Sequence, residues 1–267
     1  MDLGLAGATA VVTGGTKGMG LATAEVLAGE GASVAVLARD RAGLDQTVDR
    51  LRAIGSPDPV GLSVDVTDAG QIERAFAELS ERWPCLNSLV NTVGPMDGTF
   101  ENLTDEDWDT AFSLGTMSAV RCIRGALPLL RRAPWARIVN IGAHSIKRQS
   151  PRLVAYTAAK AALTSISKNL ARSLGPEGIL VNTVSPGTIV TASFSSTLRP
   201  LFEAEGLDPT DPHDVMRWIE SNFNHPVDLG RAGLPDEVAS IVVYLASKRN
   251  GYVTGANVNV DGGSDFN

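Results

Sequence analysis

A tyrosine and a lysine four residues apart, Tyr156 and Lys160, are the side chains best suited to move a proton. On a helix this spacing makes them neighbours on one face. A phenol with a pKa of about 10 is a poor base at neutral pH, and a nearby ammonium favours the phenolate. The spacing therefore predicts that Lys160 lowers the pKa of Tyr156, which would then exchange a proton with a substrate oxygen. Alone the pair is unspecific, because such spacing is common on helix surfaces.

A glycine-rich loop near the start of the chain follows a β-branched run and precedes a helical pattern. Missing side chains let the backbone approach a pyrophosphate, and the free N–H groups of a helix N-terminus attract its charge. In open α/β sheets, ligands bind outside the carboxyl ends of the strands, where this loop would lie. The alternative is a tight turn without a ligand. The residues predicted to bind a dinucleotide are Thr13, Gly14, Thr16, Lys17, Gly18, Met19 and Gly20.

The end of the second predicted strand distinguishes the two dinucleotides. An acid there would hold the ribose 2′-hydroxyl of NAD, whereas a basic residue suits the 2′-phosphate of NADP. The residue is Arg39, and Lys17 adds a second cation in the glycine loop. We therefore expect NADP(H) as cofactor. NAD(H) stays open, because Asp40 follows directly and Arg39 could be a solvated loop charge.

The elements that must position these residues alternate between strand and helix along 267 residues, of which 43% are hydrophobic. Near-continuous apolar runs are typical of parallel strands buried on both faces. Repeated alternation with right-handed crossovers predicts an α/β fold with a doubly wound parallel sheet of about seven strands. We expect strands near 8–13, 33–38, 60–65, 86–91, 136–142, 179–184 and 256–260, and helices near 18–29, 41–54, 68–82, 104–131, 154–174 and 235–247.

The stretch 191–234 breaks this rhythm, because it holds four prolines and only weak helical patterning. It is too long for an ordinary connection, and such insertions are usually functional lids or disordered segments. We expect a substrate lid within a single catalytic domain, 1–267. Its aromatic residues could close over an apolar substrate or form oligomer contacts. Upstream, Lys147, Arg148 and Arg152 could attract an acidic substrate or form a solvated loop.

Charge and composition argue against several other classes of protein. A net charge of −7 does not suit a general nucleic-acid binder, because phosphate attracts positive surface. We see no signal peptide, and no apolar run reaches the ~18–20 residues that a bilayer requires. Cys85 and Cys122 give no disulfide framework, and the three histidines show no metal-ligand spacing. We therefore expect a cytoplasmic protein without metal, nucleic-acid or membrane partners.

Several motifs in order resemble the short-chain dehydrogenase/reductase family over essentially the whole chain, in particular its 3-oxoacyl-carrier-protein-reductase-like members. The resemblance implies a Rossmann-like single domain, a homotetramer or dimer, and a small carbonyl or alcohol substrate. It implies hydride transfer with Tyr156 as acid/base. The matching pieces are Thr13-Gly14-x3-Gly18-x-Gly20, Asp65-Val66, Asn91-x2-Gly94, Tyr156-x3-Lys160, Pro186-Gly187-x-Ile189-x-Thr191 and Gly255 with the tail Val260-Asp261-Gly262-Gly263.

The resemblance also implies where the cofactor would lie. The residues that would meet its adenosine end are Asp65, Val66 and Asn91. Lys160 would hold the nicotinamide ribose, and Ile189 and Thr191 would hold the carboxamide. The other motif residues expected at the cofactor are Gly94, Pro186 and Gly187. Structural alternatives remain open: Asp65 could cap a helix near 68, Asn91 could satisfy backbone groups, and Thr191 could be a turn residue.

Two departures from the family pattern concern catalysis. The serine expected thirteen residues before the tyrosine is Ala143, and Gly115 stands where the family has a helical asparagine. Ser145 is our candidate carbonyl donor, and capping of local backbone is its alternative role. A helical glycine costs about 1 kcal/mol relative to alanine, which suggests close packing or a kink at Gly115. A second hypothesis is therefore a catalytically impaired NADP(H)-binding protein that acts as a sensor or interaction partner.

Overall fold

Seven parallel strands form the centre of the molecule, seen in a computed structural model that describes residues 2–94 and 98–264. Their order across the sheet is β3-β2-β1-β4-β5-β6-β7, and each neighbouring pair is parallel. This confirms the predicted doubly wound α/β fold. The strands are β1 (Thr9–Thr13), β2 (Ser33–Ala38), β3 (Val60–Ser63), β4 (Ser88–Asn91), β5 (Ala136–Ile141), β6 (Ile179–Pro186) and β7 (Asn257–Val260).

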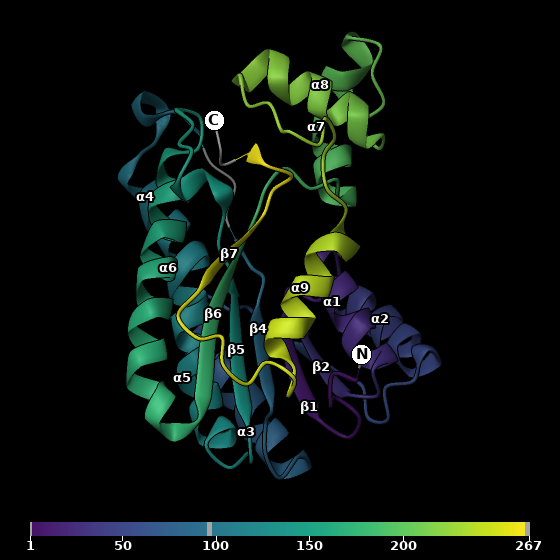
Figure 1. Ribbon diagram of the computed structural model, residues 1–267, viewed down its shortest axis with the longest axis vertical. Coiled ribbons are helices and arrows are strands. Elements are labelled where there is room, and N and C mark those ends of the chain that lie inside the picture. The colour runs from purple at the N-terminus through teal and green to yellow at the C-terminus, as the bar shows by residue number, and fades with distance from the viewer. Residues whose placement is uncertain (1, 95–97, 265–267) are drawn as a thin grey trace.

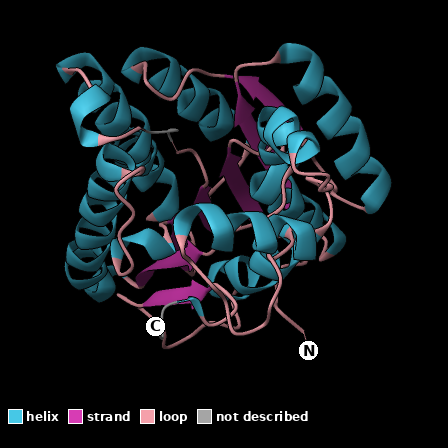
Figure 2. Cartoon of the chain, turned by 90° about the horizontal axis from the view of Figure 1, so that it is seen from above, coloured by secondary structure: helices cyan, strands magenta, loops and turns pink. Residues whose placement is uncertain are grey.

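Helices cover both faces of this sheet (Figure 1, Figure 2). One face packs on α1 (Gly18–Gly29), α2 (Arg41–Ile54) and α9 (Pro235–Ala246). The other face carries α3 (Ala69–Arg82), α4 (Asp105–Phe112), α5 (Ser118–Leu130) and α6 (Val154–Leu174). Each of the expected helices outside 104–131 is present within one residue of its predicted ends.

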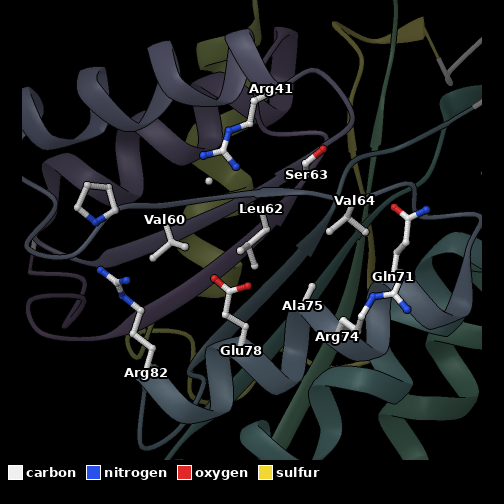
Figure 3. Close-up of a pocket in the computed structure, with 12 residues that line it drawn as sticks. Arg41, Val60, Leu62, Ser63, Val64, Gln71, Arg74, Ala75, Glu78 and Arg82 are labelled. Atoms are coloured by element: carbon white, nitrogen blue, oxygen red, sulfur yellow. The ribbon is translucent and has the colours of Figure 1, made fainter.

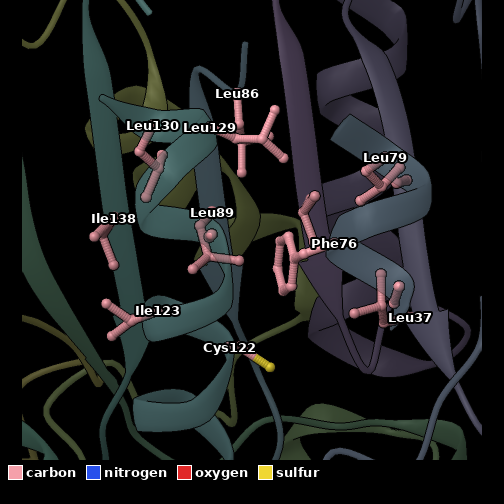
Figure 4. Close-up of a cluster of buried hydrophobic side chains, with 14 of the residues drawn as sticks. Leu37, Phe76, Leu79, Leu86, Leu89, Cys122, Ile123, Leu129, Leu130 and Ile138 are labelled. Carbon is pink, nitrogen blue, oxygen red and sulfur yellow. The ribbon is translucent and has the colours of Figure 1, made fainter. Parts of the chain in front are cut away.

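The two apolar layers follow from the alternation of side chains along a strand. Neighbouring residues of β1, Val11 and Val12, belong to clusters on opposite faces of the sheet. Figure 4 shows the layer beneath α3 and α5, in which Phe76 and Leu79 lie opposite Leu129. Burial on both faces explains why the strands read as continuous apolar runs in the sequence.

The expected helix over 104–131 is interrupted in the structure. It ends as α4 at Phe112, continues as a π-helical turn over Ser113–Met117, and resumes as α5 at Ser118. Gly115 is buried inside that turn. A π-turn adds one residue to the helical repeat and thereby shifts the face that later residues present. The irregularity expected at Gly115 is therefore a π-bulge.

The expected lid segment, 191–234, contains two helices that the weak sequence pattern did not indicate. They are α7 (Ala192–Ala204) and α8 (Pro212–Phe223), which stand above the carboxyl ends of the strands at the top of Figure 1. Phe202 is fully buried and stacks on Trp218 with 5.0 Å between ring centroids. The aromatic residues of this segment thus pack largely on one another.

Within the described ranges, no helix combines the length and apolar character that crossing a bilayer would take. Among those same residues, no group of three or more His, Cys, Asp or Glu side chains is arranged to hold a metal ion.

Candidate active site

The predicted site residues follow the carboxyl ends of six neighbouring strands. Asp65 comes after β3, Arg39 after β2, the glycine loop after β1, Gly94 after β4, Ser145 after β5, and the segment 187–191 after β6. Because these strands are adjacent and parallel, their carboxyl ends share one edge of the sheet. The fold therefore brings residues from Thr13 to Thr191, at opposite ends of most of the chain, to one edge of the sheet.

The glycine loop is held so closely that side chains would not fit. Gly14 has φ +66°, and a Cβ there would lie 2.9 Å from Oγ1 of Thr92 at the end of β4. A Cβ on Gly20 would lie 2.4 Å from the carbonyl oxygen of Gly14. The N-cap of α1, Lys17, makes no side-chain capping bond, so its first turn presents N–H groups suited to an anion.

The segment after β6 meets the glycine loop. A Cβ on Gly18 would lie 3.3 Å from Cγ2 of Thr191, which places Thr191 directly beside the start of α1. The hydroxyl of Thr191 also accepts a hydrogen bond of 3.1 Å from the Phe194 N–H and so caps α7. Ile189 pairs with Gly233 in an isolated parallel bridge, which ties this segment to the far end of 191–234.

The opposite end of the edge carries Arg39 and Asp65. Hydrogen bonds from the N–H and hydroxyl of Thr67, at 2.9 and 2.7 Å, are the main cause of the lowered pKa of Asp65, and the charge of Arg39 adds to it. Asp65 does not cap α3, because Asp68 does so with a bond from the Gln71 N–H. Arg39 is exposed and available to a charged ligand.

In the sequence, the acid Asp40 beside Arg39 leaves it open whether the cofactor is NAD or NADP. In the structure its carboxylate lies at the first turn of α2, where a Cβ on Gly43 would come within 2.8 Å of Oδ2. A helix N-terminus stabilises negative charge. Asp40 is the N-cap of α2, where its charge is favoured, although its side chain makes no capping hydrogen bond.

Lys160 is buried at 2% exposure and is anchored by the backbone. Its ammonium donates hydrogen bonds to the carbonyl oxygens of Val93, at 3.0 Å, and Ile141, at 2.8 Å. These carbonyls belong to the ends of β4 and β5, so the ammonium joins the two strands at the edge where the site lies. A Cβ on Gly94 would lie 3.1 Å from Nζ of Lys160 and 3.8 Å from Cε2 of Tyr156, which places the pair against this backbone.

Burial controls the protonation of both groups. It raises the pKa of Tyr156 to about 12 and lowers the pKa of Lys160 to about 8. The predicted lowering of the Tyr156 pKa is therefore wrong for the chain without cofactor. The physical reason is that removal from water disfavours the phenolate, while the Lys160 ammonium is directed at two carbonyl oxygens. At neutral pH Tyr156 consequently keeps its proton.

Asn91 is partly satisfied by its neighbours. Its Nδ2 donates to Oδ1 of Asn140 at 2.8 Å, and Nδ2 of Asn140 donates to Oγ of Ser167 at 2.9 Å. Oδ1 of Asn91, in contrast, is buried and accepts no hydrogen bond from the residues that the structure describes. Such a group carries a free-energy cost unless a donor reaches it. An acceptor of this kind fits a ligand that brings a hydroxyl or an N–H group.

Ser145 lies in a short 3₁₀ turn, His144–Ile146, and is 1% exposed. Its Oγ is 3.0 Å from Oγ1 of Thr157, which donates to it. Thr157 directly follows Tyr156, so this bond connects the loop after β5 to the helix of the tyrosine. Because Ser145 accepts here, its own hydroxyl hydrogen remains for another acceptor.

A groove of about 670 Å³ runs along the edge strand β3, between α2 and α3 (Figure 3). Two of the arginines that line it have acidic partners: Arg41 pairs with Asp45, and Arg82 pairs with Asp58. Its lining includes neither Tyr156 nor Lys160. The groove is therefore distinct from the edge that carries the predicted site residues.

One contact to the residue before Lys160 was not found from the sequence. In the π-turn, the hydroxyl of Thr116 donates to the carbonyl oxygen of Ala159, which precedes Lys160. Thr116 stands one position after the residue that the family pattern matches, and it lies inside the π-turn. Gly115 was the available signal, because it pointed to an irregular turn at this place.

Comparison with known proteins identifies the family. Residues 14–265 match the family model described as enoyl-(acyl carrier protein) reductase. The short-chain reductase protein NovJ of Streptomyces niveus is 32% identical over 95% of this chain and 92% of its own. The rhamnolipids biosynthesis 3-oxoacyl-[acyl-carrier-protein] reductase of Pseudomonas aeruginosa is 34% identical over 97% of this chain and 96% of its own.

A solved structure agrees. The L-sorbose reductase of Gluconobacter frateurii, crystallised with NADPH and L-sorbose, superposes with a TM-score of 0.92 and is 29% identical, with complete coverage of both chains. The chain therefore belongs to the short-chain dehydrogenase/reductase family of oxidoreductases.

Proposed function

We propose that the chain is an NADP(H)-dependent oxidoreductase that transfers hydride between the nicotinamide and a small carbonyl or secondary alcohol, with Tyr156 as acid/base. The observation that carries this proposal is the position of Tyr156 and Lys160 against Gly94, on the same sheet edge as the glycine loop. The relative solved with NADPH and L-sorbose supports both the cofactor and the reaction type.

The residues present fit a dinucleotide. The N-cap of α1 makes no side-chain capping bond, so the N–H groups of the first turn can meet a pyrophosphate, and the buried Oδ1 of Asn91 is an acceptor that needs a donor. Bound there, NADPH supplies a hydride for the carbonyl carbon. The residues that would hold it are Thr13, Gly14, Thr16, Lys17, Gly18, Met19, Gly20, Arg39, Asp65, Val66, Asn91, Gly94, Lys160, Pro186, Gly187, Ile189 and Thr191.

The protein side of the chemistry is proton donation. Tyr156 is protonated at neutral pH, as an ordinary phenol is, and burial, which raises its pKa to about 12, keeps it so. A protonated phenol can donate its proton to a substrate oxygen in the direction of reduction. Lys160 uses two of its three N–H donors on backbone carbonyls, and the third remains for a ribose hydroxyl. Ser145 is our candidate for the donor to the substrate oxygen, in place of the hydroxyl that Ala143 lacks.

The test is steady-state NADPH oxidation with a panel of ketoses, 3-oxoacyl thioesters and cyclic ketones, comparing wild type with Tyr156→Phe. We expect the variant to bind NADPH normally and to lose about 10²–10⁴-fold in kcat, the usual contribution of a general acid. Tyr252→Phe is the matched control, since Tyr252 is 98% exposed. Equal turnover by wild type and Tyr156→Phe would reject the mechanism.

The same measurements address the second hypothesis. A wild-type protein that binds NADPH tightly but reduces no compound of the panel would favour the impaired, NADP(H)-sensing protein. The proposal includes three further predictions. The chain is a single domain with a lid over 191–234, it forms a homotetramer or dimer, and it is cytoplasmic. Sedimentation of the purified chain checks the number of copies.

A further inference from the structure

The loop between β5 and α6, residues 144–152, contacts the end of the lid with three of its side chains. The ring of His144 meets the ring of His225 edge-on, with 6.2 Å between centroids. The guanidinium of Arg152 lies 5.0 Å from the centre of the Phe223 ring. The third side chain, Arg148, binds the backbone of the same stretch, at Asn224 and Pro226. A single loop therefore holds the four consecutive residues 223–226.

Arg148 makes the most specific of these contacts. Its two terminal nitrogens donate to the carbonyl oxygens of Asn224, at 3.1 Å, Pro226, at 3.3 Å, and Ser264, at 3.0 Å. The first two carbonyls belong to the lid, and the third belongs to the segment after β7. The planar fork of a guanidinium offers N–H donors on two separate terminal nitrogens, whereas the ammonium of a lysine has a single nitrogen. Arg148 thus joins three segments of the chain at one point.

The shape of the lid suits this contact. Asn224 is the C-cap of α8 and has φ +52°, in the left-handed region. The carbonyl groups at a helix C-terminus lack partners within the helix and carry partial negative charge, which a cation stabilises. Two cations that the sequence offered to an acidic substrate, Arg148 and Arg152, are therefore engaged within the chain.

The same loop is attached to the candidate active site at both of its ends. At its start, the N–H at Nδ1 of His144 donates to the carbonyl oxygen of Pro186 at 3.1 Å, and Ser145 contacts Thr157. Its far end leads directly into α6, which carries Tyr156. Movement of this loop would therefore shift the end of the lid and the start of α6 together.

We propose that Arg148 is a positioning residue, which fixes the end of the lid and the 261–264 segment against the active-site loop and so shapes the binding site of the carbonyl substrate. The kinetic half of this inference rests on the proposed function. Because Arg148 contacts backbone carbonyls, which a substitution of their residues leaves in place, replacing Arg148 is the change that removes these contacts.

The kinetic test compares wild type, Arg148→Ala and Arg148→Lys in steady-state reduction of the best carbonyl of the panel. Removing a group that positions a site from a distance costs on the order of tenfold to a hundredfold. We expect Arg148→Ala to raise the KM of the carbonyl by this factor, with the KM of NADPH changed less than about twofold and the pH profile of kcat unchanged. Arg148→Lys should recover part of the loss.

The control and the physical test need no substrate. Arg132→Ala is the matched control, because Arg132 donates to Ser80 between α5 and α3 and is remote from the lid. Hydrogen exchange should become faster at 221–228 and at 261–264 together in Arg148→Ala, and should not change at the glycine loop or in Arg132→Ala. Unchanged exchange at these two segments, or equal increases in both KM values, would overturn the proposal. If wild type reduces no carbonyl, the proposed function fails while hydrogen exchange still decides the role of Arg148.

Discussion

The hydroxyl of Thr116 donates a hydrogen bond of 2.7 Å to the carbonyl oxygen of Ala159, the residue before Lys160. Thr116 is 3% exposed and lies in the π-turn between α4 and α5. The bond fixes the turn of α6 that carries Lys160 relative to the helix opposite. In this chain Thr116, which follows Gly115, therefore holds the helical turn of Lys160. The family pattern has its asparagine in the same segment.

Replacing Thr116 by valine keeps the shape of the side chain and removes this bond. We expect Thr116→Val to lower the free energy of unfolding by about 0.5–1.5 kcal/mol, because one hydrogen bond is lost while the Ala159 carbonyl keeps its place in α6, and to lower kcat with little change in the KM of NADPH. Urea unfolding and steady-state kinetics measure both quantities. Thr116→Ser retains the hydroxyl and is the control. If the valine and serine variants behave alike, the bond has no such role.

The buried ammonium of Lys160 should make stability depend on pH. Its pKa is about 8 in the folded chain and about 10.5 when unfolded, so between these values the unfolded chain binds more protons and the free energy of unfolding rises with pH. We expect the free energy of unfolding of wild type, minus that of Lys160→Met, to increase by about 2 kcal/mol from about pH 7.5 to about pH 9.5.

The raised pKa of Tyr156 acts in the opposite direction, because its contribution to stability is lost as pH rises from about 10 to about 12. Measurements of urea unfolding should therefore stay below that range. If the free energy of unfolding of wild type, minus that of Lys160→Met, stays constant or decreases as the pH rises, the assignment of the low pKa to Lys160 is contradicted.

Arg39 should select the phosphorylated dinucleotide. A hydrogen bond to a charged group contributes about 1.5–3 kcal/mol, so Arg39→Ala should reduce the preference for NADPH over NADH by about tenfold to a hundredfold. The ratio of kcat/KM for the two cofactors is the measurement. Arg41→Ala serves as the comparison, because Arg41 is similarly exposed but pairs with Asp45. An unchanged ratio in Arg39→Ala would remove Arg39 from the site.

The sheet, and the edge along which the predicted site residues lie, could be predicted from the sequence because local signals determine them. Continuous apolar runs marked the strands, and alternation with helices determined that they are parallel, which places Gly14, Arg39, Asp65 and Thr191 along one edge. Each of these signals is contained within a few residues. Because the strands pair in parallel, the residues that carry these signals lie at the same edge of the sheet.

The remaining features depend on tertiary contacts. A π-turn adds one residue without changing composition, so 104–131 read as a single helix. Proline in the first turn of α8 starts that helix, although in the sequence Pro212 read as a break. The direction of the Tyr156 pKa shift was missed because spacing reveals a neighbouring charge but does not reveal burial. Likewise, no pattern marks which carbonyls Arg148 would reach.

The stacked rings of Phe202 and Trp218 give α7 and α8 an interior separate from the two that flank the sheet. Outward-facing positions of these helices can change without disturbing the packing of the strands or the placement of the glycine loop. Diversification of substrate range on this scaffold would then be concentrated in 191–234, and grafting that stretch from one relative to another becomes a route to a new preference. A graft should carry the 144–152 loop with it, since the two surfaces are matched to each other.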